Sequence, residues 1–163
     1  MLGPVLSDIC RDENFIELVK NAEIMDVIKF EDEIRHSELN EAAQINSQYM
    51  ENEIVNGMYR RTLMMPANKI ITGALHVADY MDIMISGHIM VKSFMVDGSI
   101  ESSEELEGFN IMRGVAGRKR VAYTLEDTIW QTVERTTASS VREAEEECLV
   151  YDIRDWPGED TNV

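Results

Sequence analysis

Apolar residues near the N-terminus recur at the spacing of an α-helix. Asp12 and Glu13 precede the first of them, where acidic side chains favour a helix N-terminus. The apolar positions of this stretch are Phe15, Ile16, Leu18, Val19, Ala22, Met25, Val27 and Ile28. A second helix is predicted at about residues 31–45. The periodicity lapses over residues 46–57, which are predicted to be a linker or extended lead-in.

From residue 58 onward the pattern changes to short runs typical of β-strands. Turn signals separate these runs, and Ser86-Gly87 predicts a hairpin. The predicted strands cover residues 58–65, 69–77, 81–85, 88–96, 121–124 and 128–133. Residues 99–108 carry several glutamates and are predicted to be a solvated loop. Many short strands without intervening helices indicate an antiparallel barrel or a double-sheet jelly roll.

The C-terminal part is predicted to be a short helix followed by an acidic tail. Ser140 and Glu143 have the spacing of a capping box, and the helix is expected to end at about residue 149. The chain therefore divides into a helical extension with its lead-in (1–57), a β-barrel (58–135), and a C-terminal helix and tail (136–163). We expect a mainly β protein.

Charge and composition narrow the classes of partner. The chain has 163 residues and a net charge of −16, which argues against nucleic acid or an anionic membrane as partner. The excess acid lies mostly in the two ends, and one basic cluster, residues 118–120, interrupts it. We interpret Arg118 and Lys119 as contacts to the protein's own acidic loops or to an acidic partner chain.

Nothing in the sequence indicates export or membrane insertion. The first residues lack the basic and apolar regions of a signal peptide, and no apolar run approaches the roughly 18–20 residues of a membrane span. Cys10 and Cys148 lie far apart, without the spacing of a metal or redox site. We therefore expect a soluble, reduced, intracellular protein.

Six short motifs follow one another between residues 58 and 133. They are Tyr59 with Arg61, Pro66-Ala67-Asn68, Thr72-Gly73-Ala74-Leu75-His76, Ser86-Gly87, Gly117-Arg118-Lys119-Arg120, and Asp127-Thr128-Ile129-Trp130. Their order resembles that of small bacteriophage-encoded proteins with an RmlC-like cupin fold, over about half of the chain. The resemblance implies an antiparallel cupin (jelly-roll) barrel, with an N-terminal helical extension and a short C-terminal helix lying outside it.

Cupins that bind a metal carry two motifs of fixed spacing. Aligning these motifs on Gly87 and Gly117 places the four ligand positions at Ala74, His76, Tyr80 and Arg120. One imidazole cannot hold a transition metal, which generally needs three or four converging ligands, and an arginine repels a cation. The resemblance therefore implies a barrel without the cupin metal, and we expect no cofactor.

The same alignment leaves a candidate ligand pocket at His76, Tyr80 and Arg120. Inward-pointing strand residues can share one barrel mouth, where these three would suit an anionic or sugar-like ligand. The alternative is a buried histidine, a tyrosine in the barrel wall and a surface arginine paired with a carboxylate. RmlC-type epimerases use a His-Asp base pair, for which Asp79 and Asp82 are the nearby candidates, although Asp79 would face away in a regular strand.

Two functions from different classes remain open. The first is a non-enzymatic phage protein, a virion structural or accessory component that binds other virion proteins or its own copies as a homo-oligomer. Its amphipathic N-terminal helix must bury its apolar stripe either on its own barrel or on another copy. The alternative is a protein, epimerase-like or simply a binder, that takes a sugar nucleotide or another anionic small molecule in the barrel mouth.

Overall fold

The computed structural model describes residues 13–36 and 49–158, and it is mainly β. Its elements in chain order are α1 (Glu13–Asn21), α2 (Ile24–His36), β1 (Met50–Val55), β2 (Met58–Met65), β3 (Ile70–Thr72), β4 (Leu75–His76), β5 (Tyr80–Ser86), β6 (His88–Phe94), β7 (Ile100–Glu107), β8 (Asn110–Gly114), β9 (Lys119–Thr124), β10 (Thr128–Arg135), α4 (Val141–Cys148), β11 (Leu149–Val150) and the 3-10 turn η1 (Ile153–Asp155). None of the described helices is long and apolar enough to cross a membrane.

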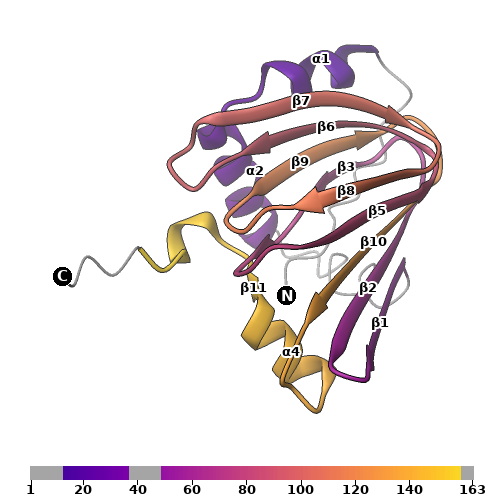
Figure 1. Cartoon of the computed structure of the whole chain (residues 1–163). Helices are drawn as coiled ribbons and strands as arrows, with labels where there is room; N and C mark the ends of the chain where they lie inside the picture. The colour runs from indigo at the N-terminus through magenta and orange to yellow at the C-terminus, as the bar shows by residue number, and fades with distance from the viewer. Residues whose placement is uncertain (1–12, 37–48, 159–163) are drawn as a thin grey trace.

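Two antiparallel sheets form the barrel (Figure 1). One has the strand order β1-β2-β10-β5-β8, the other has the order β3-β9-β6-β7, and β4 pairs separately with β11. Strands far apart in the chain, such as β2 and β10, are therefore neighbours. This arrangement confirms the predicted jelly roll.

The inner faces of the two sheets meet in an apolar core. Alternate residues of a strand point to the same face, so Leu63 and Met65 of β2 point inward together. The buried residues of this core are Met65, Ile71, Met84, Ile89, Val91 and Ala122. Where β5 turns into β6, Gly87 has a φ of +115°, and a Cβ there would lie 2.3 Å from Thr128 Oγ1. The predicted hairpin turn thus requires glycine.

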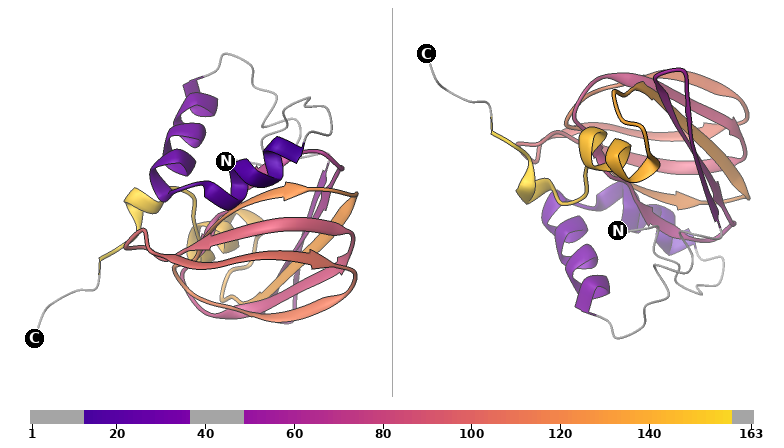
Figure 2. Two further views of the ribbon diagram at one scale, coloured as in Figure 1. Left: turned by 90° about the horizontal axis from the view of Figure 1, so that it is seen from above. Right: turned by 90° about the horizontal axis from the view of Figure 1, so that it is seen from below.

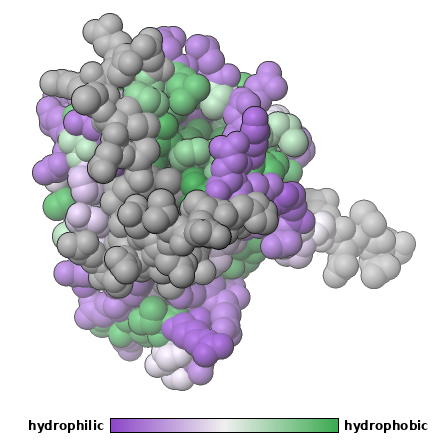
Figure 3. Space-filling view, turned by 180° about the vertical axis from the view of Figure 1, so that it is seen from behind, coloured by the Kyte–Doolittle hydropathy of each residue, from purple (hydrophilic) through white to green (hydrophobic). Residues whose placement is uncertain are grey.

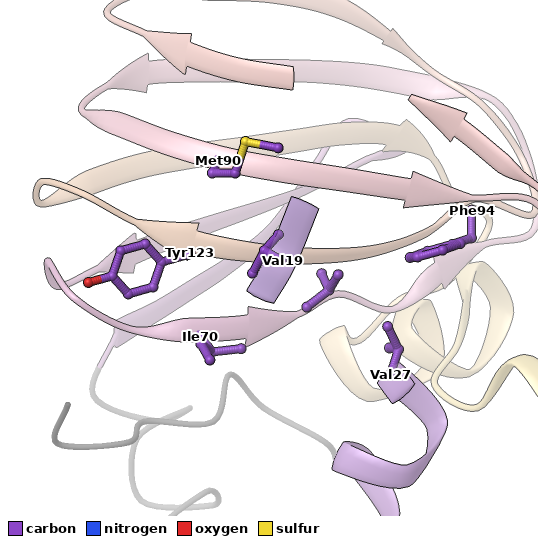
Figure 4. Packing of buried hydrophobic residues seen from close by; sticks show 7 residues of the cluster. Val19, Val27, Ile70, Met90, Phe94 and Tyr123 are labelled. Atoms are coloured by element: carbon purple, nitrogen blue, oxygen red, sulfur yellow. The ribbon is translucent and has the colours of Figure 1, made fainter. Parts of the chain in front are cut away.

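Helix α1 lies against the outer face of the four-stranded sheet, while most of α2 projects away from it (Figure 2). Figure 4 shows Val19 of α1 beside Tyr123, Ile70 and Met90 of that sheet, and Val27 of α2 nearer Phe94 in the same cluster. Seen from behind, hydrophobic residues gather in the upper part of the molecule, bordered by hydrophilic ones (Figure 3). Of the two alternatives for the apolar stripe, the structure therefore shows packing on the protein's own barrel.

Three local expectations are corrected. Residues 50–55 of the expected lead-in form β1, which pairs with β2 through the Asn56-Gly57 turn, so the sheet begins before residue 58. The expected loop 99–108 contains strand β7, paired with β6 at a sheet edge. An edge strand with one exposed face tolerates glutamates, which weaken the β pattern in the sequence. The predicted strand 69–77 is interrupted, because β3 and β4 join different sheets.

The predicted C-terminal helix is confirmed. Ser140 is its N-cap and accepts a hydrogen bond from the backbone N–H of Glu143 at 3.3 Å. The Glu143 carboxylate accepts in turn from Ser139, one residue earlier than in a standard capping box.

The division between the two predicted N-terminal helices is corrected, because α1 ends at Asn21 and α2 begins at Ile24. Helix α2 therefore includes Met25, Val27 and Ile28 of the first predicted helix and continues into the second predicted helix to His36. The expected remainder of that helix, like Cys10, lies outside the described residues.

Candidate ligand cavity inside the barrel

A cavity of about 130 Å³ lies between the two sheets. Its walls are mostly apolar and come from both sheets: Met50, Leu63, Met65, Ile71, Ala74, Ile89, Val91, Ala122 and Trp130. A small number of polar side chains enter it, namely Arg61, Thr72, His76, Tyr80, Arg120, Thr132 and Tyr151. A concave, mostly apolar space with a few polar groups is the usual form of a small-molecule site, and this cavity is partly open to its surroundings.

His76 is held in a buried pair with Glu134. The His76 Nδ1 and Glu134 Oε1 atoms are 2.6 Å apart, and both side chains are almost fully buried. The Tyr80 ring stacks on the imidazole with ring centres 3.7 Å apart. Burial raises the pKa of Tyr80 to about 12, so its hydroxyl stays protonated at neutral pH. A carboxylate that holds one histidine nitrogen leaves the other to exchange a proton with a ligand.

Arg120 reaches the cavity from β9 and is fixed there by Asp82 of β5. Its Nη1 lies 2.6 Å from Asp82 Oδ2, and Asp82 is fully buried. Trp130 Nε1 donates a hydrogen bond to the other Asp82 oxygen at 2.5 Å. The guanidinium carbon lies 5.3 Å from the centre of the Trp130 ring, close enough for a cation–π contact. The Arg120 charge is therefore already balanced within the protein.

Arg61 is a second guanidinium at the cavity, and the sequence analysis missed it as a site residue. It lies on β2 opposite Thr132 of β10, which in turn lies opposite Asp82 of β5, so the three form one row across the sheet. Its Nη2 donates a hydrogen bond to the Met50 sulfur at 3.4 Å, and its buried Nε has no hydrogen-bond partner among the described residues. Side chains two residues apart on a strand point to the same face, so the apolar Leu63 on the same strand was the sequence signal that could have placed Arg61 inward.

The three residues predicted to share a pocket, His76, Tyr80 and Arg120, all line this cavity. The structure places them in one cavity, but it also pairs buried His76 with Glu134 and Arg120 with Asp82, as the alternative expected. A ligand-binding role for the three residues stays a prediction. The epimerase comparison suggested Asp79 or Asp82 as the acidic partner of His76. Neither is its partner in the structure, where Glu134 holds this histidine. Asp79 instead accepts hydrogen bonds outside the cavity, from Arg113 and from a backbone N–H. Glu134, 58 residues from His76, was missed because only the fold brings β10 beside that histidine.

The other two residues of the basic cluster, Arg118 and Lys119, form ion pairs within the chain. Arg118 makes two hydrogen bonds to Glu101 of β7. The expectation that Lys119 contacts a partner chain is corrected: its side chain is 1% exposed, and its Nζ lies 2.5 Å from Glu31 of α2. Neighbouring residues of a strand point to opposite faces, so Lys119 meets the helix layer while Arg120 enters the cavity.

The cavity residues do not fit the metal that many cupins carry. The positions aligned with cupin ligands, Ala74, His76, Tyr80 and Arg120, all line the cavity, but an alanine cannot ligate and an arginine opposes a cation. Within residues 13–36 and 49–158, no three His, Cys, Asp or Glu side chains come close enough to hold a metal ion. We therefore derive no metal chemistry for this site.

No family model and no curated protein matches the sequence. Similar solved structures include the coconut allergen cocosin, with 10% identity over 49% of this chain and 22% of that one, at a TM-score of 0.43. A conserved protein with a double-stranded β-helix domain from Klebsiella pneumoniae has 14% sequence identity over 56% of this chain and 78% of that one, at a TM-score of 0.44. An RmlC-like cupin family protein from Methanocaldococcus jannaschii has 10% sequence identity over 53% of this chain and 77% of that one, at a TM-score of 0.41. The matched region of this chain thus spans only about a fifth of the length of cocosin.

Proposed function

We propose that the protein binds a small anionic organic molecule in the cavity between its two sheets. The observation that carries this proposal is the meeting of two guanidinium groups, Arg61 and Arg120, in one small apolar space. Guanidinium groups make paired, charge-assisted hydrogen bonds with carboxylates and phosphates, and these bonds are strongest where water is excluded. His76 and Tyr80 add polar groups that can orient the ligand.

The volume of the cavity limits the size of the ligand. About 130 Å³ is close to the roughly 150 Å³ of an engineered protein cavity that binds benzene. A whole sugar nucleotide is far larger, so its base and phosphates would lie outside the barrel. A ligand of about the size of one ring therefore fits better than the sugar nucleotide considered from the sequence. Because His76 and Glu134 can move a proton, such a ligand could also be a substrate.

Binding can be tested with a panel of anions: benzoate, succinate, glucose 1-phosphate and inorganic phosphate. We expect isothermal titration calorimetry to detect at least one of them and expect Arg120→Met to weaken that ligand at least about tenfold. The matched control is Arg142→Met, since Arg142 is 88% exposed on α4. Circular dichroism checks that each variant is folded, and Arg120→Lys keeps a charge opposite Asp82. Failure of the whole panel to bind would overturn the proposal.

A protein-interaction role is the second candidate, favoured by exposed apolar side chains on the outer face of the five-stranded sheet. Met81 is 49% exposed, Ile111 is 61% exposed, and the nearby Phe109 is 66% exposed. Ile83 of β5 pairs directly with Ile111 of β8, which places Met81 and Ile111 on one surface. We propose a second copy of the chain as the partner, because apolar sheet faces are common in homodimers.

The interaction candidate has its own test. Analytical ultracentrifugation should find the wild type as an oligomer and the Ile111→Glu variant as a monomer. A monomeric wild type would contradict it. The phage origin and a place in a virion stay predictions, and detection of the protein in purified particles is the measurement that checks them.

A further inference from the structure

We infer that the bound molecule is a compact monocarboxylic acid with an apolar body, anchored by Arg61 together with the Tyr151 hydroxyl. This inference rests on the proposed function, because it names the ligand class and the anchor of the same cavity. Three observations carry it: Arg120 has a carboxylate partner and Arg61 has none within ion-pair distance among the described residues, buried hydroxyl groups lack hydrogen-bond partners, and the cavity walls are mostly apolar.

Arg61 and Arg120 differ in what balances their charge. Arg120 is paired with the fully buried Asp82, whereas Arg61 has no Asp or Glu within ion-pair distance among the described residues. Glu145 of α4, whose buried Oε1 also lacks a hydrogen-bond partner, and Glu134 of β10 lie in the same region and offset part of the Arg61 charge. Neither carboxylate is within 4.0 Å of an Arg61 nitrogen. A partly buried charge without a partner is unfavourable, so the natural occupant of the space beside Arg61 is an anion.

Unpartnered polar atoms mark the place of that anion. Arg61 Nε, Arg120 Nε, Thr132 Oγ1 and the Tyr151 hydroxyl are all buried, lack a hydrogen-bond partner and belong to residues that line the cavity. Arg61 and Tyr151 line the same cavity; burial raises the pKa of Tyr151, and the Arg61 charge opposes this shift. A carboxylate has two oxygens and about four acceptor sites, enough for a guanidinium and a hydroxyl together.

The rest of the cavity argues for a single acidic group on an apolar body. Beyond Arg61 the walls are largely aliphatic, with Trp130 on one side. A second carboxylate on the ligand would approach the carboxylates of Asp82 and Glu134, which would repel it. A ring or branched chain of about six carbons fills the volume, so benzoate is a suitable probe.

The decisive experiment compares benzoate with benzamide, which has the same shape and no charge. We expect benzoate to bind, benzamide to bind at least about tenfold more weakly, and Arg61→Met to weaken benzoate by at least about tenfold. Arg60→Met is the matched control, because Arg60 is the neighbouring residue on β2 and pairs outside with Glu53. If Arg61→Met does not fold, Tyr151→Phe gives an independent test, with an expected several-fold loss for benzoate alone.

The outcomes separate this inference from the proposed function. Binding of succinate or glucose 1-phosphate that depends on Arg120, without binding of benzoate, would overturn the inference and leave the proposed function standing. Equal binding of benzoate and benzamide, or equal effects of Arg60→Met and Arg61→Met, would show an apolar pocket without a carboxylate anchor. Failure of every anion to bind would overturn both.

Discussion

Replacing Lys119 by methionine should lower the free energy of unfolding by about 3–5 kcal/mol. Lys119 joins the barrel to the helix layer, because its Nζ lies 2.5 Å from Glu31 of α2 and also donates to the Tyr151 carbonyl oxygen at 3.0 Å. The two charged side chains are only 1% and 3% exposed. The substitution removes one charge of the pair and leaves Glu31 buried.

The magnitude follows from opposing electrostatic terms. At 2.5 Å and an effective dielectric constant of about 20, the attraction between the two charges is about 6–7 kcal/mol. Removing each ion from water costs several kcal/mol, so the intact pair contributes little net stability. Loss of Lys119 removes the attraction but not the cost of burying Glu31. The double variant Lys119→Met/Glu31→Leu removes both charges and should recover most of the loss.

Urea unfolding followed by tryptophan fluorescence measures these differences. The control is Arg142→Met, because the Arg142–Glu146 pair is 88% and 66% exposed and such pairs contribute within about 1 kcal/mol. A Lys119→Met variant as stable as Arg142→Met would refute the reasoning. A double variant as unstable as the single one would also refute it, because the loss would then come from packing and not from the buried charge of Glu31.

Three further predictions concern single positions. A Cβ at Gly114 would lie 2.3 Å from the Tyr80 ring, so Gly114→Ala should displace that ring and weaken ligand binding, measured by calorimetry. Burial raises the pKa of Cys148 to about 11, so in a Cys10→Ser background its reaction with a disulfide reagent at pH 8 should be roughly 100-fold slower than that of a free thiol. Hydrogen bonds from a backbone N–H and an arginine hold the pKa of Asp79 below its usual 3.8. Its stabilisation is present at neutral pH and lost as the pH falls through the folded pKa. Urea unfolding should therefore show Asp79→Asn less stable than wild type at pH 7, with the difference in unfolding free energy shrinking as the pH is lowered below 3.8.

The strand pattern was enough to predict the fold, because alternation and turn residues act locally. The Ser86-Gly87 turn was predicted from its residues, and the φ of +115° at Gly87 shows why. Strands β1 and β7 were missed because they pair at sheet edges. Such strands keep an exposed face, and their many glutamates therefore look like a loop in the sequence.

The cavity could be predicted only in part. His76, Tyr80 and Arg120 were found because the cupin spacing places them at one level of the barrel. Glu134 and Arg61 were missed because their roles depend on strand pairing: β10 lies between β2 and β5, and no local pattern fixes that order. Inward-facing positions of strands are usually apolar, so a polar residue in a strand is normally expected to face solvent. A buried polar residue can therefore be recognised only once the strand pairing is known.

The basic cluster at the start of β9 changes the meaning of the net charge. Read along the sequence, Arg118, Lys119 and Arg120 form a patch that could meet an acidic partner. In the structure each has a different acidic partner within the chain: Glu101 on β7, Glu31 on α2 and Asp82 on β5. The net charge of −16 therefore does not describe the cavity, where the Arg61 guanidinium has no carboxylate within ion-pair distance among residues 13–36 and 49–158. Because nearby buried charges act more strongly than distant solvated ones, an acidic protein can still select an anion.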